Sequence, residues 1–230
     1  MKAIAMCGRY TFTKVPKSES VINPDGVVLD LKPRYNQAPG QYALIRTQEA
    51  PTALSWHRWG LIPAWAKDKK IAYKLINARA ETVAEKPSFR TAFQRYRCLV
   101  LADGFFEWKK TLSGKIPHWI TLADESAFAF AGLSESWTSP EGKPLHTFTV
   151  ITTEPNELMV DIHDRMPAIL TEETARLWLQ PDLVEKDAQA LLQPFPAGLM
   201  KAHPVSPEVG KVQHDHPGLI QPYEPPPTLF

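Results

Sequence analysis

The stretch CLVLADGFFEWKKTLSGKIPHWITLA, at residues 98–123, decides the fold class. The runs at 98–103 and 118–123 are short and apolar, which is typical of strands in a sheet. Between them, FFEWKK at 105–110 is followed by a turn that carries Gly114 and by a further strand, which is the pattern of a β-hairpin. The stretch therefore predicts short strands joined by tight turns.

On either side of this stretch, the chain adds strands and a few helices without regular alternation. Strand patterns recur at 41–47, 127–133 and 146–153, and helical patterns at 87–96, 171–180 and 182–193. Thr171 is a suitable N-cap for the second helix, and Pro194 would end the third. We therefore expect an α+β fold, a mixed, strand-rich domain with a curved, barrel-like sheet flanked by helices.

Length and proline content favour one loop-rich domain. A chain of 230 residues can bury a substantial core. We expect a single domain at 7–222, preceded by an extension at 1–6 and followed by a proline-rich, extended tail at 223–230. The 22 prolines argue against a helical bundle, because proline is poorly tolerated inside helices and central strands.

Charge and cysteine usage bear on compartment and partners. The net charge of +1 neither indicates nor excludes nucleic acid, since a local basic patch can act within a neutral total. Two cysteines, Cys7 and Cys98, argue against a disulfide framework. No apolar run approaches the ~20 residues of a membrane span. These features predict a cytoplasmic protein with no membrane partner.

Four polar residues in apolar or tight contexts are candidates for chemistry: Cys7, Asn77, Glu107 and His163. Each also has a structural explanation. Cys7 could be a small buried hydrophobe, and Asn77 could be a turn or cap residue. Glu107 could face solvent from its strand, and His163 could be a structural histidine. Singly, none of the four signals is specific.

Other features are weaker still. Cys98 begins an apolar strand and is expected in the core. His214 and His216, in VQHDHPG, could chelate a metal, but no third ligand at a suitable spacing accompanies them, so we expect no metal and no cofactor. The tryptophan-rich run SWHRWGLIPAW at 55–65 is compatible with core packing or with a stacking platform for bases.

Seven segments occur in an order that is typical of one family. They are MCGRYTFT (6–13), RYNQAPG (34–40), WGLIPAW (59–65), INARAET (76–82), ADGFFEWKK (102–110), VDIHDRMPAIL (160–170) and HPVSPEVG (203–210). Through them the chain resembles the SOS-response-associated peptidase family, or SRAP domain, from Cys7 to about residue 222. Seven ordered segments make a chance match very improbable.

The resemblance implies an abasic-site sensor of the DNA damage response. Members of the family crosslink covalently to the ring-opened sugar aldehyde of an abasic site in single-stranded DNA, through an N-terminal cysteine that matches Cys7. An α-amine, which titrates near about 7.7–8.0, can condense with the aldehyde to an imine. The neighbouring thiol can then close a thiazolidine ring. An internal cysteine has an amide nitrogen and offers only a reversible hemithioacetal.

The resemblance also implies roles for the other candidates. Glu107 would move protons, His163 would assist opening of the sugar ring, and Asn77 would hold the cysteine by hydrogen bonds. Arginines would contact phosphates and tryptophans would stack on unpaired bases; the residues implied are Arg9, Arg79, Arg165, Trp65 and Trp108. The expected partner is single-stranded DNA with abasic sites, bound by a monomer that associates with the nucleoid when on DNA.

Other functions remain open on the sequence. A thiol peptidase or autopeptidase would use Cys7 with His163 and Asn77, and it would not need a free amine. A non-covalent reader of single-stranded or modified DNA would use the same residues only for binding. An imine route without the thiol could also cleave the DNA as a lyase.

The start of the chain departs from the family pattern. In the family the cysteine follows the initiator methionine directly, whereas here MKAIA precedes Met6 and Cys7. Three explanations fit: translation begins at Met6, residues 1–6 are removed later, or the protein no longer forms the ring. We expect the first, because Met6 and Cys7 form a start-like pair from which the methionine can be removed.

Overall fold

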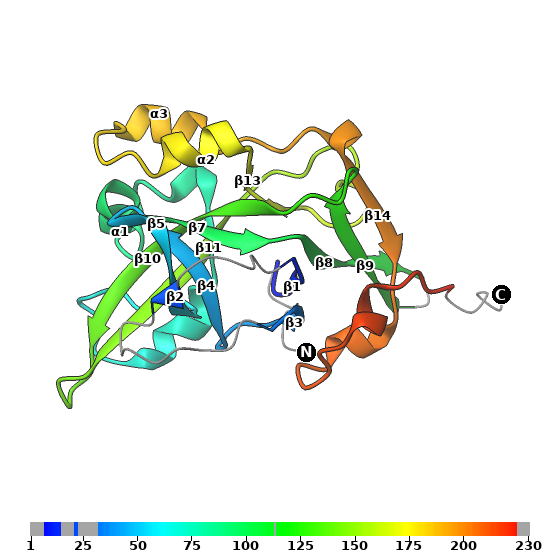
Figure 1. Ribbon diagram of the computed structural model, residues 1–230, viewed down its shortest axis with the longest axis horizontal. Helices are drawn as coiled ribbons and strands as arrows, with labels where there is room; N and C mark the ends of the chain where they lie inside the picture. The colour runs from blue at the N-terminus through cyan, green and yellow to red at the C-terminus, as the bar shows by residue number, and fades with distance from the viewer. Residues whose placement is uncertain (1–6, 15–20, 23–31, 113, 225–230) are drawn as a thin grey trace.

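The computed structural model describes residues 7–14, 21–22, 32–112 and 114–224. The expected extension at 1–6 and residues 225–230 of the expected tail lie outside this part of the chain. Within it, the strands form two sheets that lie next to each other, with the α-helices gathered along the larger one (Figure 1). No helix in these described ranges has the length and apolar character needed to cross a membrane.

The larger sheet contains a closed barrel of five strands. They are β4 (Tyr42–Thr47), β5 (Ala50–Trp59), β7 (Arg97–Ala102), β10 (Phe128–Thr138) and β11 (Pro144–Thr153). The hydrogen-bonded order β11-β10-β7-β4-β5 closes because β5 also pairs with β11, in parallel, with Phe148 opposite Trp59. The predicted α+β fold with a barrel-like sheet is confirmed.

Four short strands extend this sheet: β2 (Val21–Ile22), β6 (Asn77–Arg79), β12 (Met166–Pro167) and β13 (Ile169–Leu170). β6 runs parallel to β11, with Asn77 opposite Val150. β12 pairs with the end of β11, with Pro167 opposite Thr152. These short strands bring the segments around Asn77 and His163 to the same end of β11.

The smaller sheet has the order β14 (Met200–Pro204), β9 (Gly114–Leu122), β8 (Gly104–Thr111), β1 (Tyr10–Phe12) and β3 (Arg34–Gln37). The predicted hairpin is β8–β9, in which Thr111 pairs with Gly114. Gly114 has a φ of +132°, which L side chains rarely adopt, and this explains the glycine at the hairpin turn.

Alternate side chains along the barrel strands point to opposite faces of the sheet and contribute to two separate hydrophobic cores. In β7, β10 and β11, even-numbered residues such as Val100, Phe130 and Phe148 point into the barrel, where Cys98 is also fully buried as expected. Odd-numbered residues such as Leu99 and Leu133 point to the helices. Both faces of these strands are therefore apolar, which accounts for the continuous apolar runs in the sequence.

The α-helices cover the outer face of the barrel (Figure 1). They are α1 (Arg90–Arg95), α2 (Glu172–Trp178) and α3 (Glu185–Ala190), each shorter than the sequence pattern predicted. Thr171 is the N-cap of α2, as expected, because its hydroxyl accepts a hydrogen bond from Thr174 N–H at 3.2 Å. The 3-10 helices are η1 (Lys69–Lys74), η2 (Ala80–Thr82), η3 (Ala197–Leu199), η4 (Pro207–Gly210) and η5 (Pro217–Ile220).

The chain crosses from the barrel to the smaller sheet at Asp103 and Gly104. The Asp103 carboxylate accepts hydrogen bonds from the Thr11 hydroxyl at 2.5 Å and from Lys14 N–H at 2.8 Å, so it ties the segment after β1 to this crossing. A Cβ on Gly104 would lie 2.2 Å from the Trp119 ring nitrogen. Only glycine allows this approach, and the packing sets β1 against β8.

Candidate active site

The register of β1 against β8 brings Cys7 to Glu107. Tyr10 pairs with Phe105 in this antiparallel ladder, and Phe106 N–H donates to Arg9 O at 3.0 Å. Continuing the same register by two residues places Gly8 opposite Glu107, so Cys7, the adjacent residue, lies beside this glutamate, 100 positions away in the sequence. The contact is direct, because Cys7 N–H donates a hydrogen bond to Glu107 Oε1 at 2.6 Å.

Glu107 is a buried carboxyl, only 2% exposed. It lies on the Phe105 face of β8, toward the barrel core, while Phe106 lies on the opposite face against Val205 and Val209. Both faces of the strand are covered, so the solvent-facing alternative for Glu107 is wrong. Burial raises the pKa of Glu107, although His163 and the hydrogen bonds from Cys7 oppose the rise.

Cys7 has a buried thiol and an unusual backbone. Its φ is +45°, in the left-handed region that a residue with a Cβ adopts only at a cost. Burial, with the Glu107 carboxylate beside it, raises the pKa of the thiol well above its usual value, and the Arg165 charge opposes this only partly. The resting group is therefore a neutral thiol rather than a thiolate.

A turn after β11 presents His163. Asn156 Oδ1 accepts from Met159 N–H at 2.9 Å, and Asn156 Nδ2 donates to Phe195 O at 2.6 Å. His163 N–H then donates to Met159 O at 2.8 Å. The buried Asn156 thus fixes the turn. Sequence reasoning missed it, although an asparagine directly after a proline is a common turn signal.

The His163 ring faces Glu107 on one side and solvent on the other. Its Nε2 lies 3.8 Å from Glu107 Oε2, beyond a direct hydrogen bond but within the range of a charge interaction. Its Nδ1 lies 3.0 Å from Asp164 Oδ1 and 3.2 Å from Arg165 N–H. His163 is partly exposed and Asp164 largely so, which places the open approach to Glu107 on this side.

Arg165 is held by the protein itself. Its Nη1 and Nη2 donate to the two carboxylate oxygens of Glu81 at 2.7 and 2.9 Å, and Nη2 also donates to Thr152 O at 2.7 Å. Partial burial would raise the pKa of Glu81, but the hydrogen bonds from Arg165 outweigh it and the pKa is lowered. A phosphate at Arg165, which is 8% exposed, would have to compete with Glu81. Sequence reasoning missed this carboxylate, although it lies in INARAET.

A small cavity of about 10 Å³ lies behind Cys7, lined in part by Arg9, Tyr10, Trp59 and Pro167. This is room for about one water molecule, so the cavity is the closed end of the site. Arg9 also donates from Nη1 to Val209 O at 3.2 Å. Arg9 therefore lies at the Cys7 cavity, with one side bonded to the segment after β14.

The remaining expected residues are not among the side chains that line this cavity. Asn77 is half-buried in β6, opposite Val150, whose side chain also lines the cavity. Arg79 and Trp65 are exposed, Trp65 by 60%. Trp108 is half-buried against the cluster of Phe106, Val205, Val209 and Leu219. The structure thus brings Cys7, Glu107, His163 and Arg9 together and leaves Arg79 and Trp65 on the surface.

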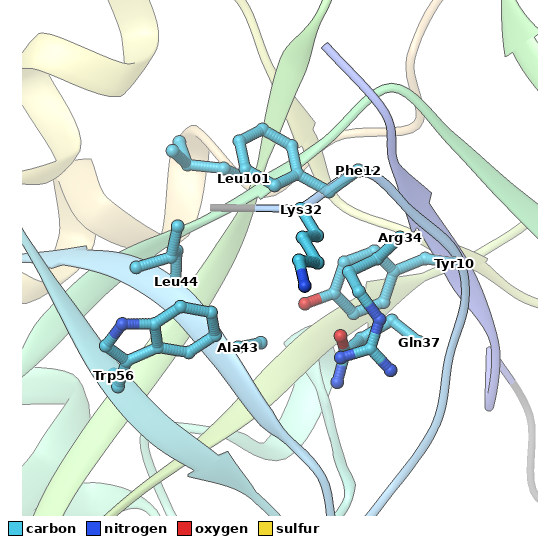
Figure 2. A pocket seen from close by; sticks show the side chains of 9 residues that line it. All are labelled: Tyr10, Phe12, Lys32, Arg34, Gln37, Ala43, Leu44, Trp56 and Leu101. Carbon is cyan, nitrogen blue, oxygen red and sulfur yellow. The ribbon is translucent and has the colours of Figure 1, made fainter. Parts of the chain in front are cut away.

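A second cavity is also lined by Tyr10 (Figure 2). It too has a volume of about 10 Å³, and its walls include the apolar side chains of Leu44, Trp56 and Leu101. Lys32 and Arg34 point into it toward the Tyr10 hydroxyl (Figure 2). Among the described residues that line it there is no cysteine, histidine or carboxylate, and these are the groups that make the Cys7 cavity a site for chemistry.

Comparison with known proteins identifies the family of the chain. The sequence profile of the family described as SOS response associated peptidase (SRAP) matches residues 6–212. The chain is 49% identical over 222 residues to the abasic site processing protein YoqW of Bacillus subtilis (strain 168), and the match covers 94% of this chain and 99% of YoqW. It is 34% identical over 226 residues to the abasic site processing protein YedK of Escherichia coli (strain K12), covering 94% of this chain and 100% of YedK.

A crystal structure of a protein from Bacteroides thetaiotaomicron shares the fold. The two superpose with a TM-score of 0.80 at 34% sequence identity, over 84% of this chain and 87% of that chain.

Proposed function

The chain belongs to the SOS-response-associated peptidase (SRAP) family, and on this premise we propose that it processes abasic sites in DNA through a covalent crosslink at Cys7. The observation that carries the proposal is the 2.6 Å hydrogen bond between the Cys7 main-chain nitrogen and the buried Glu107 carboxylate. It aims a proton acceptor at the backbone nitrogen of the cysteine. A free α-amine at that position would be in direct hydrogen-bond contact with Glu107, its proton acceptor.

The proposed reaction needs only an aldehyde and an N-terminal cysteine. The amine adds to the aldehyde carbon, and the carbinolamine loses its hydroxyl as water to leave an imine. The thiol sulfur then bonds to the imine carbon, and the thiol proton moves to the nitrogen. The product is a five-membered thiazolidine plus one water, with no change of oxidation state. Because an amide cannot form the imine, the proposal requires that the Met6–Cys7 bond be absent in the active form.

Glu107 is the proposed proton carrier. As a carboxylate it takes the proton from the attacking amine, and as a carboxylic acid it returns a proton to the departing hydroxyl. The raised pKa of Glu107 brings both protonation states closer to neutral pH. One group can therefore serve both half-reactions.

His163 and Asn77 are proposed to act on the sugar and the linkage. His163 lies on the open side of Glu107 and would transfer a proton at the sugar ring oxygen or hydroxyl as the aldehyde forms. Asn77 would hydrogen-bond the linkage from β6, on the strand beside Val150. The His163 assignment rests on its 3.8 Å distance to Glu107 Oε2, and the Asn77 assignment rests on its place in β6 opposite Val150, which lines the Cys7 cavity.

The state of the thiol favours the crosslink over a thiol peptidase. Peptidases of that type use a thiolate, which a neighbouring histidine generates by lowering the thiol pKa. Here burial and Glu107 raise the pKa of Cys7. A neutral thiol is adequate for the proposed route, because the amine attacks first and the sulfur closes the ring on an activated imine.

The proposed partner is single-stranded DNA. Arg79 and Trp65 are exposed and available for a phosphate and for base stacking. Arg9 and Trp108 have one side packed on the protein and one side open. Arg165 would contact DNA only by exchanging its bonds to Glu81. Such contacts carry little base-sequence information, so the aldehyde itself would provide the specificity.

A denaturing gel tests the proposal. The protein, with Cys7 verified as its first residue by intact mass, is incubated with a single-stranded oligonucleotide that carries one abasic site. We expect a heat- and SDS-stable band whose mass equals protein plus DNA minus one water. Intact single strands and an abasic duplex are the comparisons, and no adduct on the abasic strand would overturn the proposal.

One added glycine before Cys7 separates this chemistry from a peptidase. The addition keeps the thiol but converts the α-nitrogen into an amide, so crosslinking should be lost while a thiol-dependent cleavage would persist. A non-covalent reader would bind equally in both forms and give no band on the denaturing gel.

A further inference from the structure

We propose that Glu208, His214 and His216 form a zinc site on the loop that follows β14. Among the described residues they make the one group of three metal-binding side chains whose donor atoms all lie within 4.8 Å of one another. His214 Nδ1 lies 3.6 Å from Glu208 Oε1, and His216 Nε2 lies 3.9 Å from Glu208 Oε2. The sequence argued against a metal because two histidines had no third ligand, and the fold supplies one.

The donor set is the one that zinc selects. Two imidazoles and a carboxylate, with a fourth position left to water, are common zinc ligands at about 2.0–2.2 Å from the metal. Tetrahedral ligands at that distance lie roughly 3.3–3.6 Å apart, so the donor atoms, which all lie within 4.8 Å of one another, reach that arrangement by side-chain rotation. Glu208 and His216 are 51% and 48% exposed and are free to make them.

Hydrogen bonds to the rest of the protein hold the loop that carries the three donor side chains. Asn36 Nδ2 donates to three carbonyl oxygens in it, those of Val209, Lys211 and His214, at 3.2, 3.0 and 2.8 Å. The carboxylate of Asp215, between the two histidines, is bonded to Arg34 Nε and to Tyr35 N–H, both at 2.6 Å. Asp215 is thus directed to β3, while the flanking histidines are directed to Glu208.

One further observation indicates a ligand at this position. His214 Nδ1 is enclosed by protein and makes no hydrogen bond to any residue that the structure describes, since its 3.6 Å distance to Glu208 Oε1 is too long for one. A buried ring nitrogen without a partner is costly, and a metal ion would satisfy it. A Cβ on Gly218 would lie only 3.1 Å from the His216 ring, so the glycine lets the backbone approach that ring.

The site would stabilise the loop that holds Arg9. Arg9 donates to Val209 O and Gly210 O, directly after Glu208 in the chain. A zinc ion joining Glu208 to His214 and His216 would close the loop around these carbonyls. The inference stands on its own residues and does not depend on the crosslinking proposal.

Zinc titration of the full chain tests the site. The protein is stripped with a chelator and titrated with zinc in competition with a chromophoric chelator. We expect one equivalent to bind, and the affinity to fall by roughly 100-fold or more in His216→Gln and Glu208→Gln, since even outer-shell partners of a metal contribute about 10–100-fold. Both residues are half-exposed, so these variants should fold, which circular dichroism checks.

Two control variants exclude other zinc ligands. Cys7→Ser removes the thiol and His146→Gln removes a histidine outside the cluster, and both should bind zinc as the parent does. Cobalt in place of zinc should give a four-coordinate spectrum without a sulfur-to-metal charge-transfer band. Loss of binding in Cys7→Ser, a sulfur band, parent-like affinity in Glu208→Gln and His216→Gln, or no one-equivalent binding would each overturn the proposal.

Discussion

The main-chain nitrogen of Cys7 donates a 2.6 Å hydrogen bond to a carboxylate, Glu107, that is 100 positions away and almost fully buried. The bond exists because β1 and β8 pair in a register that Gly104 and Asp103 support. It puts a base at the backbone nitrogen rather than only at the sulfur. This relationship sets the order of steps that we propose, with the amine first and the thiol second.

Alanine substitution should abolish the crosslink at Cys7 and leave it unchanged at Cys98. Cys7→Ala removes the sulfur that closes the ring, so the stable thiazolidine adduct should disappear. Cys98→Ala should crosslink at the parent rate, because Cys98 is buried in the barrel among Val100 and Gly132, at a cost in stability of the order of 1 kcal/mol. Intact mass after denaturation measures both, and a lost adduct in Cys98→Ala with the fold intact would contradict this assignment.

Glu107→Gln should slow both formation and reversal of the adduct. One proton carrier serves both directions by microscopic reversibility, and the loss of a positioned acid or base costs about 10²–10⁴-fold in rate. Glutamine keeps the shape and can still accept from Cys7 N–H, so the variant is matched in structure. Time courses of adduct gain, and of loss after dilution with competing aldehyde, give the two rates. A normal reversal rate would exclude Glu107 from the mechanism.

The same substitution should stabilise the fold increasingly as pH rises. Burial raises the pKa of Glu107 above its value in the unfolded chain, so the folded parent holds the carboxyl proton more tightly than the unfolded chain does. The free energy of unfolding of the parent therefore falls as pH rises through the raised pKa, because the buried carboxyl must then lose its proton. The Glu107→Gln variant has no such loss. Its advantage should therefore grow with pH, by about 1.4 kcal/mol for each pKa unit of the shift.

Urea unfolding of parent and variant across the pH range measures this difference. Glu85→Gln, at an exposed glutamate, is the control for the amide substitution itself. If the free energies of unfolding of Glu107→Gln and the parent differ by the same amount at every pH, then burial does not raise the pKa of the Glu107 carboxyl.

Arg79 and Arg165 should respond differently to alanine. Arg79 is exposed, and if it contacts a phosphate its loss should reduce the log–log salt slope of binding to single-stranded DNA by about 0.7. Arg165→Ala leaves Glu81 and Thr152 O without their donor, and it should lower stability by about 1–3 kcal/mol. Fluorescence anisotropy at several salt concentrations and urea unfolding measure the two effects. Arg90→Ala, at an exposed residue of α1, is the control.

The residues before Cys7 should decide whether the ring can form. A protein that keeps Met1 through Met6 has an amide at Cys7 and should give no thiazolidine, whereas expression from Met6 should give an N-terminal Cys7 and full crosslinking. N-terminal sequencing and intact mass identify each form before the assay. Equal adduct rates for the two verified forms would contradict the free-amine mechanism.

Local sequence patterns were sufficient for the strand-rich class and for several elements. The strands β4, β7, β9, β10 and β11, the β8–β9 hairpin and the cap at Thr171 all follow from patterns a few residues long. Other elements were not predicted. The strand β5 lacks a simple alternation, and β1, β3 and β6 have at most four residues, so only their pairing partners stabilise them as strands.

The sequence by itself determined the family, the candidate residues Cys7, Glu107 and His163, and the strand-rich character of the fold. Residue type and order carry that information, because chemistry belongs to side chains and local periodicity belongs to elements. Only the tertiary structure decided which groups meet. Burial of Glu107, the pairing of Arg165 with Glu81, and the approach of Glu208 to two histidines depend on strand register and loop packing between distant segments. Contacts of that kind arise only when the whole core closes, and no local pattern encodes them.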